Sequence, residues 1–294
     1  AFLRAKCPDP RSVLTLVPTL GGGWYTKAGE EYWRVYDYVE NTICLQRPET
    51  DEDFYQSAVG FGTFQQLLTD FPAEKLHETI LNFHNTPDRY RILRETIGRD
   101  PMHRAAQVRP EIEFALAREA EMAVIQTALD AGELPLRVTH NDTKLNNVLL
   151  DAKTRKALCI VDLDTVMPGS SLYDFGDAIR FGASTAAEDE RDLSRVEMSL
   201  DRFRVFTLGY VRSCPGLTEK ELELLPLGAK TMTMECGVRF LTDHLNGDQY
   251  FPAHREGQNL DRARTQFKLA ADMEKKWAEM RRIVAEVSGS TQNT

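Results

Sequence analysis

Short runs of β-branched and aromatic residues alternate with turn-forming residues at the beginning of the chain. Val13–Leu20 and Glu31–Val39 have this composition, and three consecutive glycines, 21–23, lie between them. Such runs bounded by glycine are typical of strands that pair as a hairpin. Because no lysine follows the glycines at the spacing of a phosphate-binding loop, we predict a turn here and not a nucleotide-binding motif.

Apolar residues recur every three or four positions through much of the chain after residue 50, which is the spacing of a buried helix face. The predicted helices cover Asp53–Phe71, Pro110–Gly132, Glu188–Val211, Leu217–Asn246 and Asp261–Val287. The residues around His84 resemble a loop that enters a further helix. His84 has no evident partner in the sequence, so we interpret it as structural, with a place in the substrate cleft as the alternative.

Three short apolar runs, Leu136–Thr139, Asn147–Leu150 and Ala157–Val161, are separated by polar, turn-prone residues. This pattern predicts a strand, a loop and two further strands. Acidic residues near the ends of these strands would then face one cleft.

The predicted loop contains His140, Asp142 and Asn147 in the pattern H-x-D-x-x-x-x-N, and Asp162 and Asp164 follow the third run. Phosphoryl transfer needs a group that orients the acceptor hydroxyl and takes up its proton, and oxygen ligands for the magnesium ions that hold the nucleotide. Asp142 fits the first role, and Asn147 and Asp162 fit the second. A single histidine before an aspartate is more often structural, but the whole pattern predicts a phosphotransferase.

Lys144 lies two residues after Asp142. A cation at this position would stabilise charge on the transferring phosphoryl group. The alternative is an ordinary solvated lysine of a loop.

Four segments resemble the aminoglycoside phosphotransferase and choline kinase superfamily of small-molecule kinases, and within it the N-acetylhexosamine 1-kinases most closely. They are YWRVYDYVENT (Tyr32–Thr42), HNDTKLNNVL (His140–Leu149), VDLDTVMPGSSLYDFGDAIR (Val161–Arg180) and RFLTDHLNGDQYF (Arg239–Phe251). The resemblance implies an α+β, protein-kinase-like fold with two lobes. Residues 1–41 would form a partial β-rich nucleotide-binding lobe and hinge, and residues 42–294 a mostly helical lobe with the catalytic loop and the acceptor site.

The resemblance also implies a reaction, in which ATP and Mg²⁺ serve to phosphorylate the anomeric hydroxyl of N-acetylglucosamine or N-acetylgalactosamine. Backbone groups at Val39, Glu40 and Asn41 would bind adenine. Many superfamily members have histidine or glutamine where this chain has Lys144, so this position departs from the common pattern. Asp174 and Asp177 are interpreted as braces of the catalytic loop.

The acceptor residues follow from the same resemblance. Asp164 stands where the protein-kinase D-F-G motif has glycine, and it would bind a second magnesium ion or a sugar hydroxyl. Thr165 would line the sugar pocket. Arg239 and Asp243 share one helical face and would bind sugar oxygens, with Tyr250 against the sugar ring. A structural Arg–Asp pair between helices is the alternative for this face.

The relatives carry a glycine-containing phosphate loop and a strand lysine upstream of the hinge, and the 294 residues begin without them. These groups position the β- and γ-phosphates. We therefore expect the chain as given to transfer phosphate more slowly than a longer form that contains them.

Composition argues for a globular protein and against several other classes of protein. A hydrophobic content of 42% allows a large core, and no apolar run approaches the length of about 20 residues that a membrane helix needs. The five cysteines are widely spaced and include no C-x-x-C pair, which argues against a disulfide framework or a zinc site. A net charge of −9 disfavours nucleic acid and anionic membranes as partners. We expect a cytoplasmic enzyme, and the oligomeric state is not indicated.

Two other functions are compatible with these motifs. The first is a related kinase for an aminoglycoside, choline or another alcohol. Choline would need an aromatic cage and an aminoglycoside a strongly acidic pocket. The second is a catalytically inactive, kinase-like binding module.

Overall fold

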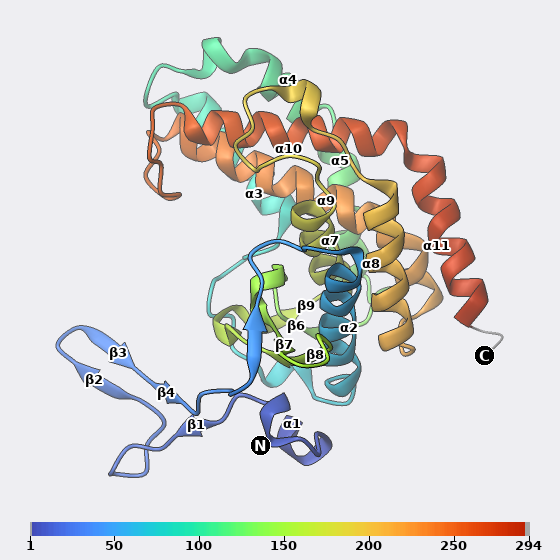
Figure 1. The fold of residues 1–294 in the computed structure, drawn as a ribbon. Coiled ribbons are helices and arrows are strands. Elements are labelled where there is room, and N and C mark those ends of the chain that lie inside the picture. The colour runs from blue at the N-terminus through green and yellow to red at the C-terminus, as the bar shows by residue number, and fades with distance from the viewer. Residues whose placement is uncertain (1, 292–294) are drawn as a thin grey trace.

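The strands lie between residues 16 and 169, and helices form most of the rest of the structure (Figure 1). The computed structural model describes residues 2–291. The strands are β1 (Leu16–Val17), β2 (Thr26–Ala28), β3 (Glu31–Trp33), β4 (Val35–Tyr36), β5 (Thr42–Cys44), β6 (Arg137–Thr139), β7 (Val148–Asp151), β8 (Ala157–Ile160) and β9 (Met167–Gly169). The helices are α1 (Phe2–Lys6), α2 (Asp51–Leu67), α3 (Thr86–Arg99), α4 (Arg109–Leu116), α5 (Glu119–Met122), α6 (Val124–Asp130), α7 (Ser171–Gly182), α8 (Leu200–Ser213), α9 (Glu219–Leu245), α10 (Gln258–Lys275) and α11 (Trp277–Thr291). Within the described part, no helix is both long and apolar enough to cross a membrane.

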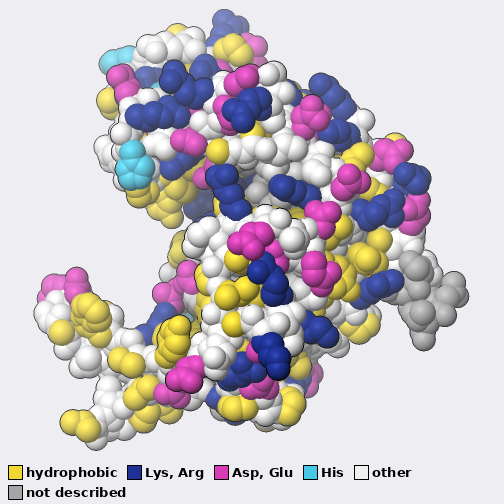
Figure 2. Space-filling model, in the orientation of Figure 1, with side chains coloured by type: hydrophobic (Ala, Val, Ile, Leu, Met, Phe, Trp, Pro, Cys, Tyr) yellow, Lys and Arg dark blue, Asp and Glu magenta, His cyan; other side chains and the backbone are white. Residues whose placement is uncertain are grey.

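The first four strands form a narrow antiparallel ribbon that projects from the body (Figure 1), with β1 paired to β4 and β2 to β3. The glycines at 21–23 form a turn between β1 and β2, as predicted, and the chain reverses at Gly29, which has a left-handed φ of 65°. Large apolar side chains cover the ribbon and remain exposed (Figure 2), among them Trp24, Tyr32 and Trp33.

The three strands predicted around the H-x-D-x-x-x-x-N pattern are confirmed. β5, β7 and β8 form one antiparallel sheet, and β6 pairs with β9 beside it. The loop from Thr139 to Val148 therefore leaves one sheet and enters the other. Its residues are held between the two sheets and helix α7.

Two of the predicted helices are confirmed as single helices. Helix α2 begins at a capping box formed by Thr50 and Asp53, and α9 begins at one formed by Thr218 and Glu221. In each box the threonine accepts a backbone N–H and the acid accepts one in return, which satisfies donors that the helix itself leaves free.

The single helices predicted over Pro110–Gly132 and Asp261–Val287 are wrong. The first segment is divided into α4, α5 and α6, and its bend brings Arg118 to Glu274 of α10 in a two-bond ion pair with N–O distances of 2.8 Å. The second is divided into α10 and α11 at Lys276. Apolar spacing does not detect such bends, because the residues on both sides still face the core.

The predicted helix over Glu188–Val211 is wrong in its first half, because α8 begins only at Leu200. Side chains of α10 hold the segment before α8 through hydrogen bonds to its backbone. Asp272 accepts the N–H of Met198 at 2.8 Å, and Lys268 donates to the carbonyl of Val196 at 2.9 Å. These contacts replace the intrahelical bonds that the prediction required.

Helices α7 and α9 cross in close contact, and the crossing depends on two glycines. A Cβ atom on Gly176 would lie 2.3 Å from the carbonyl oxygen of Gly228, and one on Gly228 would lie 2.7 Å from the carbonyl oxygen of Leu172. Both obstructing atoms belong to the backbone. The crossing sets how the polar residues of α7 face those of α9.

We predict that Gly176→Ala lowers the free energy of unfolding by about 1–3 kcal/mol, because the added methyl group separates α7 from α9. Gly98→Ala is the matched control, since Gly98 is an exposed residue of α3 with open space around it and should be neutral or stabilising. Urea unfolding measures both. Equal stability of the two variants would show that the α7–α9 crossing tolerates a side chain.

Candidate active site

The backbone of the catalytic loop is held by the buried carboxylate of Asp174 at the start of α7. Asp174 accepts the N–H of His140 at 2.9 Å, the N–H of Asn141 at 2.8 Å and the side-chain amide of Gln65 at 2.8 Å. Burial raises the pKa of Asp174, while these donors favour its charged form. The contacts allow Asn141 to adopt a left-handed φ of 66° directly before Asp142.

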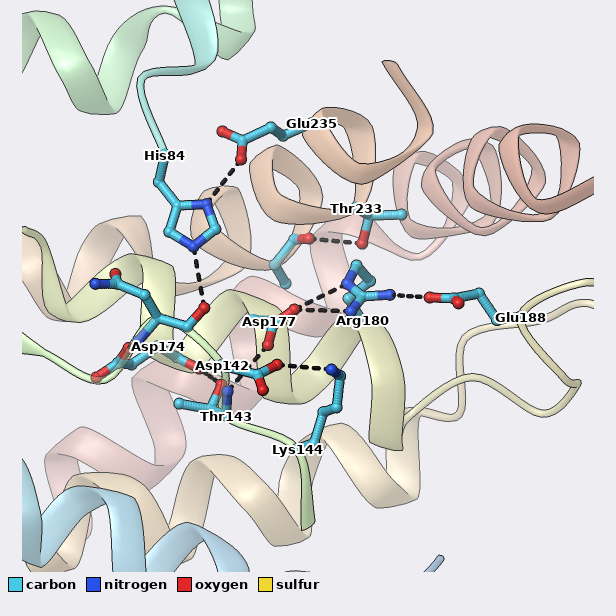
Figure 3. Close-up of polar contacts among 12 residues, drawn as sticks. His84, Asp142, Thr143, Lys144, Asp174, Asp177, Arg180, Glu188, Thr233 and Glu235 are labelled. Carbon is cyan, nitrogen blue, oxygen red and sulfur yellow. Dashed lines mark hydrogen bonds and ion pairs between the residues drawn. The ribbon is translucent and has the colours of Figure 1, made fainter. Parts of the chain in front are cut away.

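A second buried carboxylate of α7, Asp177, holds the next part of the loop (Figure 3). It accepts the N–H of Thr143 at 3.0 Å and two N–H groups of Arg180 at 2.8 and 3.0 Å. Burial acts to raise the pKa of Asp177, but the Arg180 guanidinium outweighs it and the pKa is lowered. Arg180 also pairs with Glu188 at 2.7 Å. Both aspartates thus lie where the interpretation as loop braces requires.

Asp142, Lys144 and Asn147 are in mutual contact at the end of the loop. The ammonium of Lys144 lies 2.8 Å from one carboxylate oxygen of Asp142, and the Asn147 amide donates to the other at 3.0 Å and to the Asp142 carbonyl at 2.8 Å. Burial acts to lower the pKa of Lys144, but the bond to Asp142 raises it overall. Lys144 therefore stays an ammonium beside the carboxylate.

The residues predicted to bind magnesium fit that cation. Both donor contacts of Asn147 go to Asp142, which leaves its amide oxygen without a hydrogen bond within the described residues. The Asp162 side chain also has no polar partner among residues 2–291, and a backbone bond of 3.0 Å between Val161 and Asn147 keeps the two segments adjacent. No cluster of three or more histidine, cysteine or acidic residues able to hold a metal occurs in the described part of the chain. The donor set suits Mg²⁺, which takes few protein oxygens together with water and substrate phosphates.

Asp164 and Thr165 have other partners. The Asp164 carboxylate forms an ion pair with Arg34, which lies between β3 and β4. The Thr165 hydroxyl donates to the carbonyl of His140 at 2.7 Å, and the Thr165 carbonyl accepts the Asn141 amide at 2.8 Å. Neither residue lines the cavity that contains Asp142.

That cavity has a volume of about 330 Å³ and lies between the catalytic loop, α7, α9 and residues 251–254. Arg239 of α9 lines it, partly buried, with its guanidinium 5.1 Å from the ring centre of Phe83, 5.8 Å from that of Tyr250 and 5.3 Å from that of Phe251. Within residues 2–291 the Arg239 guanidinium makes no hydrogen bond and no ion pair. The structural Arg–Asp pair considered for this face is not formed.

Asp243 does not face the cavity. One of its carboxylate oxygens accepts the N–H groups of Gln249 and Tyr250 at 3.0 and 2.8 Å, and the other accepts the N–H of Phe251 at 2.9 Å and the Asn259 amide at 3.0 Å. These contacts argue against the prediction that Asp243 binds substrate, because the loop after α9 occupies both oxygens. Tyr250 is largely exposed, and its ring packs edge-on against Phe251.

The three residues assigned to adenine connect the ribbon to β5. Val39 is buried, Glu40 is exposed, and Asn41 has a left-handed φ of 56°. The Val39 carbonyl accepts the Thr42 hydroxyl at 2.9 Å, and the Asn41 carbonyl accepts the N–H of Ala152 at 2.8 Å. These bonds fix the turn between the ribbon and the sheet of the catalytic loop.

The sequence did not identify His84 and Glu235 as a pair. They lie 151 positions apart, and in the structure the His84 Nδ1 is 2.7 Å from a carboxylate oxygen of Glu235 (Figure 3). Both are buried, and both line the cavity of Asp142 and Arg239. The only sequence signal was an acidic residue in the apolar run of α9.

We predict that Asp243→Asn lowers the free energy of unfolding by about 2–3 kcal/mol. The NH₂ group of the asparagine would face backbone N–H groups that now donate hydrogen bonds to the buried carboxylate. Asp201→Asn, in the exposed first turn of α8, serves as the control and should change stability little. Urea unfolding measures the difference. An unchanged midpoint for Asp243→Asn would mean that the loop after α9 does not depend on this carboxylate.

Comparisons with known proteins identify a family and a fold. The phosphotransferase enzyme family is matched over residues 3–204. An aminoglycoside phosphotransferase from Alicyclobacillus acidocaldarius subsp. acidocaldarius DSM 446 has a similar structure with a TM-score of 0.63 at 13% identity, covering 97% of this chain and 81% of its own. A microcompartment-associated aminopropanol kinase has a TM-score of 0.60 at 16% identity, covering 95% of this chain and 80% of its own.

At these identities the structural matches establish the fold and do not identify an acceptor. They confirm the predicted α+β, kinase-like architecture. The family match spans the catalytic loop, Asp162 and both buried aspartates of α7. The chain therefore belongs to the phosphotransferase enzyme family, whose members include small-molecule kinases of this fold.

Proposed function

We propose that this phosphotransferase uses ATP and Mg²⁺ to phosphorylate the anomeric hydroxyl of an N-acetylhexosamine. The observation that carries the proposal is the Arg239 guanidinium, which lines the cavity of Asp142, forms no ion pair within hydrogen-bond distance among the described residues and lies near three aromatic rings. A guanidinium offers several N–H donors to hydroxyl and acetamido oxygens, and an aromatic face packs against the apolar side of a sugar ring.

The charges of the cavity favour a neutral, oxygen-rich acceptor over an amine. Its four carboxylates are already paired: Asp142 with Lys144, Asp177 and Glu188 with Arg180, and Glu235 with His84. An aminoglycoside or an amino alcohol would need an unpaired carboxylate, and its ammonium would lie near Arg239. This observation weighs against the cationic alternatives.

We assign the chemical roles as follows. Asp142 orients the sugar O1 and receives its proton while O1 bonds to the γ-phosphorus and the bond to ADP breaks, and the Lys144 ammonium stabilises the negative charge of the transferring group. Asn147 and Asp162 would hold Mg²⁺, which when bound neutralises charge on the nucleotide phosphates. Asp164, tied to Arg34, would act on the metal only through water or after release.

The division of the chain follows from these roles. Residues 1–41 would supply part of a nucleotide-binding lobe and the hinge, with Val39, Glu40 and Asn41 beside the adenine. Residues 42–294 would supply the catalytic loop and the acceptor pocket. The exposed apolar ribbon and the turn after it are consistent with this division.

We predict that Asp142→Asn lowers kcat by about 10²–10⁴-fold, because asparagine keeps the shape of the side chain but cannot accept the proton. Nucleotide and acceptor affinities should stay within about threefold, since other residues bind both substrates. A coupled ADP assay and calorimetry measure the two effects. A kcat within threefold of the parent would remove Asp142 from the role of base.

The acceptor is tested by incubating the protein with ATP, Mg²⁺ and a panel of N-acetylglucosamine, N-acetylgalactosamine, 1-deoxy-N-acetylglucosamine, choline, ethanolamine and an aminoglycoside. We expect phosphorus NMR to detect a 1-phosphate of an N-acetylhexosamine, and the 1-deoxy sugar to bind without being phosphorylated. Arg239→Gln should raise the KM of the sugar at least tenfold and leave the KM of ATP unchanged.

Each other result has a definite meaning. A sugar 6-phosphate would exclude the 1-kinase and retain the kinase. Phosphorylation of an amine acceptor would replace the proposed substrate. Acceptor binding without any ADP formation would favour the inactive binding module.

A further inference from the structure

His84 lies just before α3 and is buried between the catalytic loop and α9. Its Nδ1 is 2.7 Å from a carboxylate oxygen of Glu235, and its Nε2 is 3.2 Å from the backbone carbonyl oxygen of Asn141 (Figure 3). The carbonyl oxygen can only accept, and Glu235, whose pKa is lowered, accepts as an ionised carboxylate. Each ring nitrogen must therefore donate, and only the imidazolium form of histidine has two N–H groups.

The surroundings of His84 support this cation. The second carboxylate oxygen of Glu235 accepts the Thr86 hydroxyl at 2.6 Å, so both oxygens are fixed. Burial acts to raise the pKa of Glu235, but attraction to His84, the bond between them and the charge of Arg239 lower it overall. Asp177 of α7 is a further acidic group that interacts electrostatically with His84, and Arg89 of α3 interacts with Glu235.

The carbonyl that His84 holds belongs to the peptide group between Asn141 and Asp142. The N–H of the same peptide group belongs to Asp142 and donates to Nδ1 of His140 at 3.3 Å. His140 Nε2 faces the carbonyl of Val161 at 2.9 Å. His140 must then donate from Nε2 and accept at Nδ1, which is the neutral form of the ring.

One planar peptide group is thus held on opposite edges by two histidines in different protonation states. Because the peptide is planar, fixing its oxygen and its N–H fixes the orientation of the peptide plane and the position of the Asp142 Cα, from which the carboxylate projects. His84 connects the Asn141 carbonyl oxygen to Glu235 of α9. The same helix carries Arg239 one turn later. The catalytic loop and the acceptor side of the cavity therefore share one polar connection.

We propose that His84 is a positioning residue, held as an imidazolium, that fixes the Asn141–Asp142 peptide group against neutral His140 and links Asp142 to the acceptor helix α9. This inference rests on the proposed function, because it assigns His84 a part in placing the base of that reaction. His84 does not touch the reacting atoms. Its effect on catalysis passes through the backbone of the loop.

Two substitutions of His84 test its contacts with Glu235 and with the Asn141 carbonyl one at a time. In His84→Gln the side-chain amide can replace the N–H at the Nε2 position and still donate to the Asn141 carbonyl. In His84→Asn the shorter amide replaces only the N–H at the Nδ1 position and keeps Glu235. We expect kcat to fall about 10–100-fold in His84→Asn and to stay within about threefold of the parent in His84→Gln.

The KM of ATP should be unchanged in both variants. Thr86→Val is the matched control, because it removes the other bond to Glu235 and leaves the Asn141 carbonyl held. Its kcat should remain near that of the parent. Equal kcat values for His84→Asn and His84→Gln would overturn the inference, because a role in folding alone does not distinguish the two amides.

Nitrogen NMR of histidine-labelled full-length chain tests the protonation states without any turnover. We expect the His84 ring at neutral pH to show two protonated nitrogens and the His140 ring to show one, with His84→Gln used to assign the signals. A His84 ring with one unprotonated nitrogen would overturn the inference even if the variants did not fold. A parent without kinase activity but with these two ring states would refute the proposed function and leave the polar connection standing.

Discussion

The carboxylate of Asp174 is the contact on which the geometry of the site depends. It lies fully inside the protein and accepts consecutive backbone N–H groups of the loop that carries Asp142. A loop of irregular backbone cannot satisfy its own N–H groups, and leaving them buried without acceptors costs free energy comparable to that of lost hydrogen bonds. One buried acid therefore makes the left-handed turn at Asn141 possible, and this turn directs Asp142 toward the cavity.

The same helix connects the loop to the acceptor side. Asp177 and Arg180 follow Asp174 at one-turn spacing, and Arg180 reaches Glu188 across the rim of the cavity. Helix α9 approaches α7 closely where two glycines face each other, and from there it presents Glu235 and Arg239 to the cavity. Because each acid of the cavity has a cationic partner, Arg239 is left to interact with a ligand. The selectivity that we propose for a neutral acceptor thus follows from which charges are paired.

Particular residues show which parts of the fold and of the site could be predicted from the sequence. The strands and the loop around Asp142 were predictable because their apolar runs are short and separated by turn-forming residues. The bend at Arg118 was not, since it accompanies an ion pair with a residue 156 positions away, which short-range spacing cannot show. Asp243 shares a helical face with Arg239, but its direction is set by the loop that folds back over it. Spacing along a helix specifies a face and does not specify which groups meet that face.

The sequence by itself indicated the phosphotransferase family, because Asp142, Asn147 and Asp162 occur in a characteristic pattern within one short segment. It also determined the strands around the catalytic loop and the helices α2 and α9, because these follow from short-range periodicity. Only the tertiary structure decided which acids are paired with a cation and which residues hold the catalytic loop. It also decided that Glu235 lies beside His84. Those outcomes depend on contacts between residues far apart in sequence, because the free energy of burying a charge depends on the partner that packs against it.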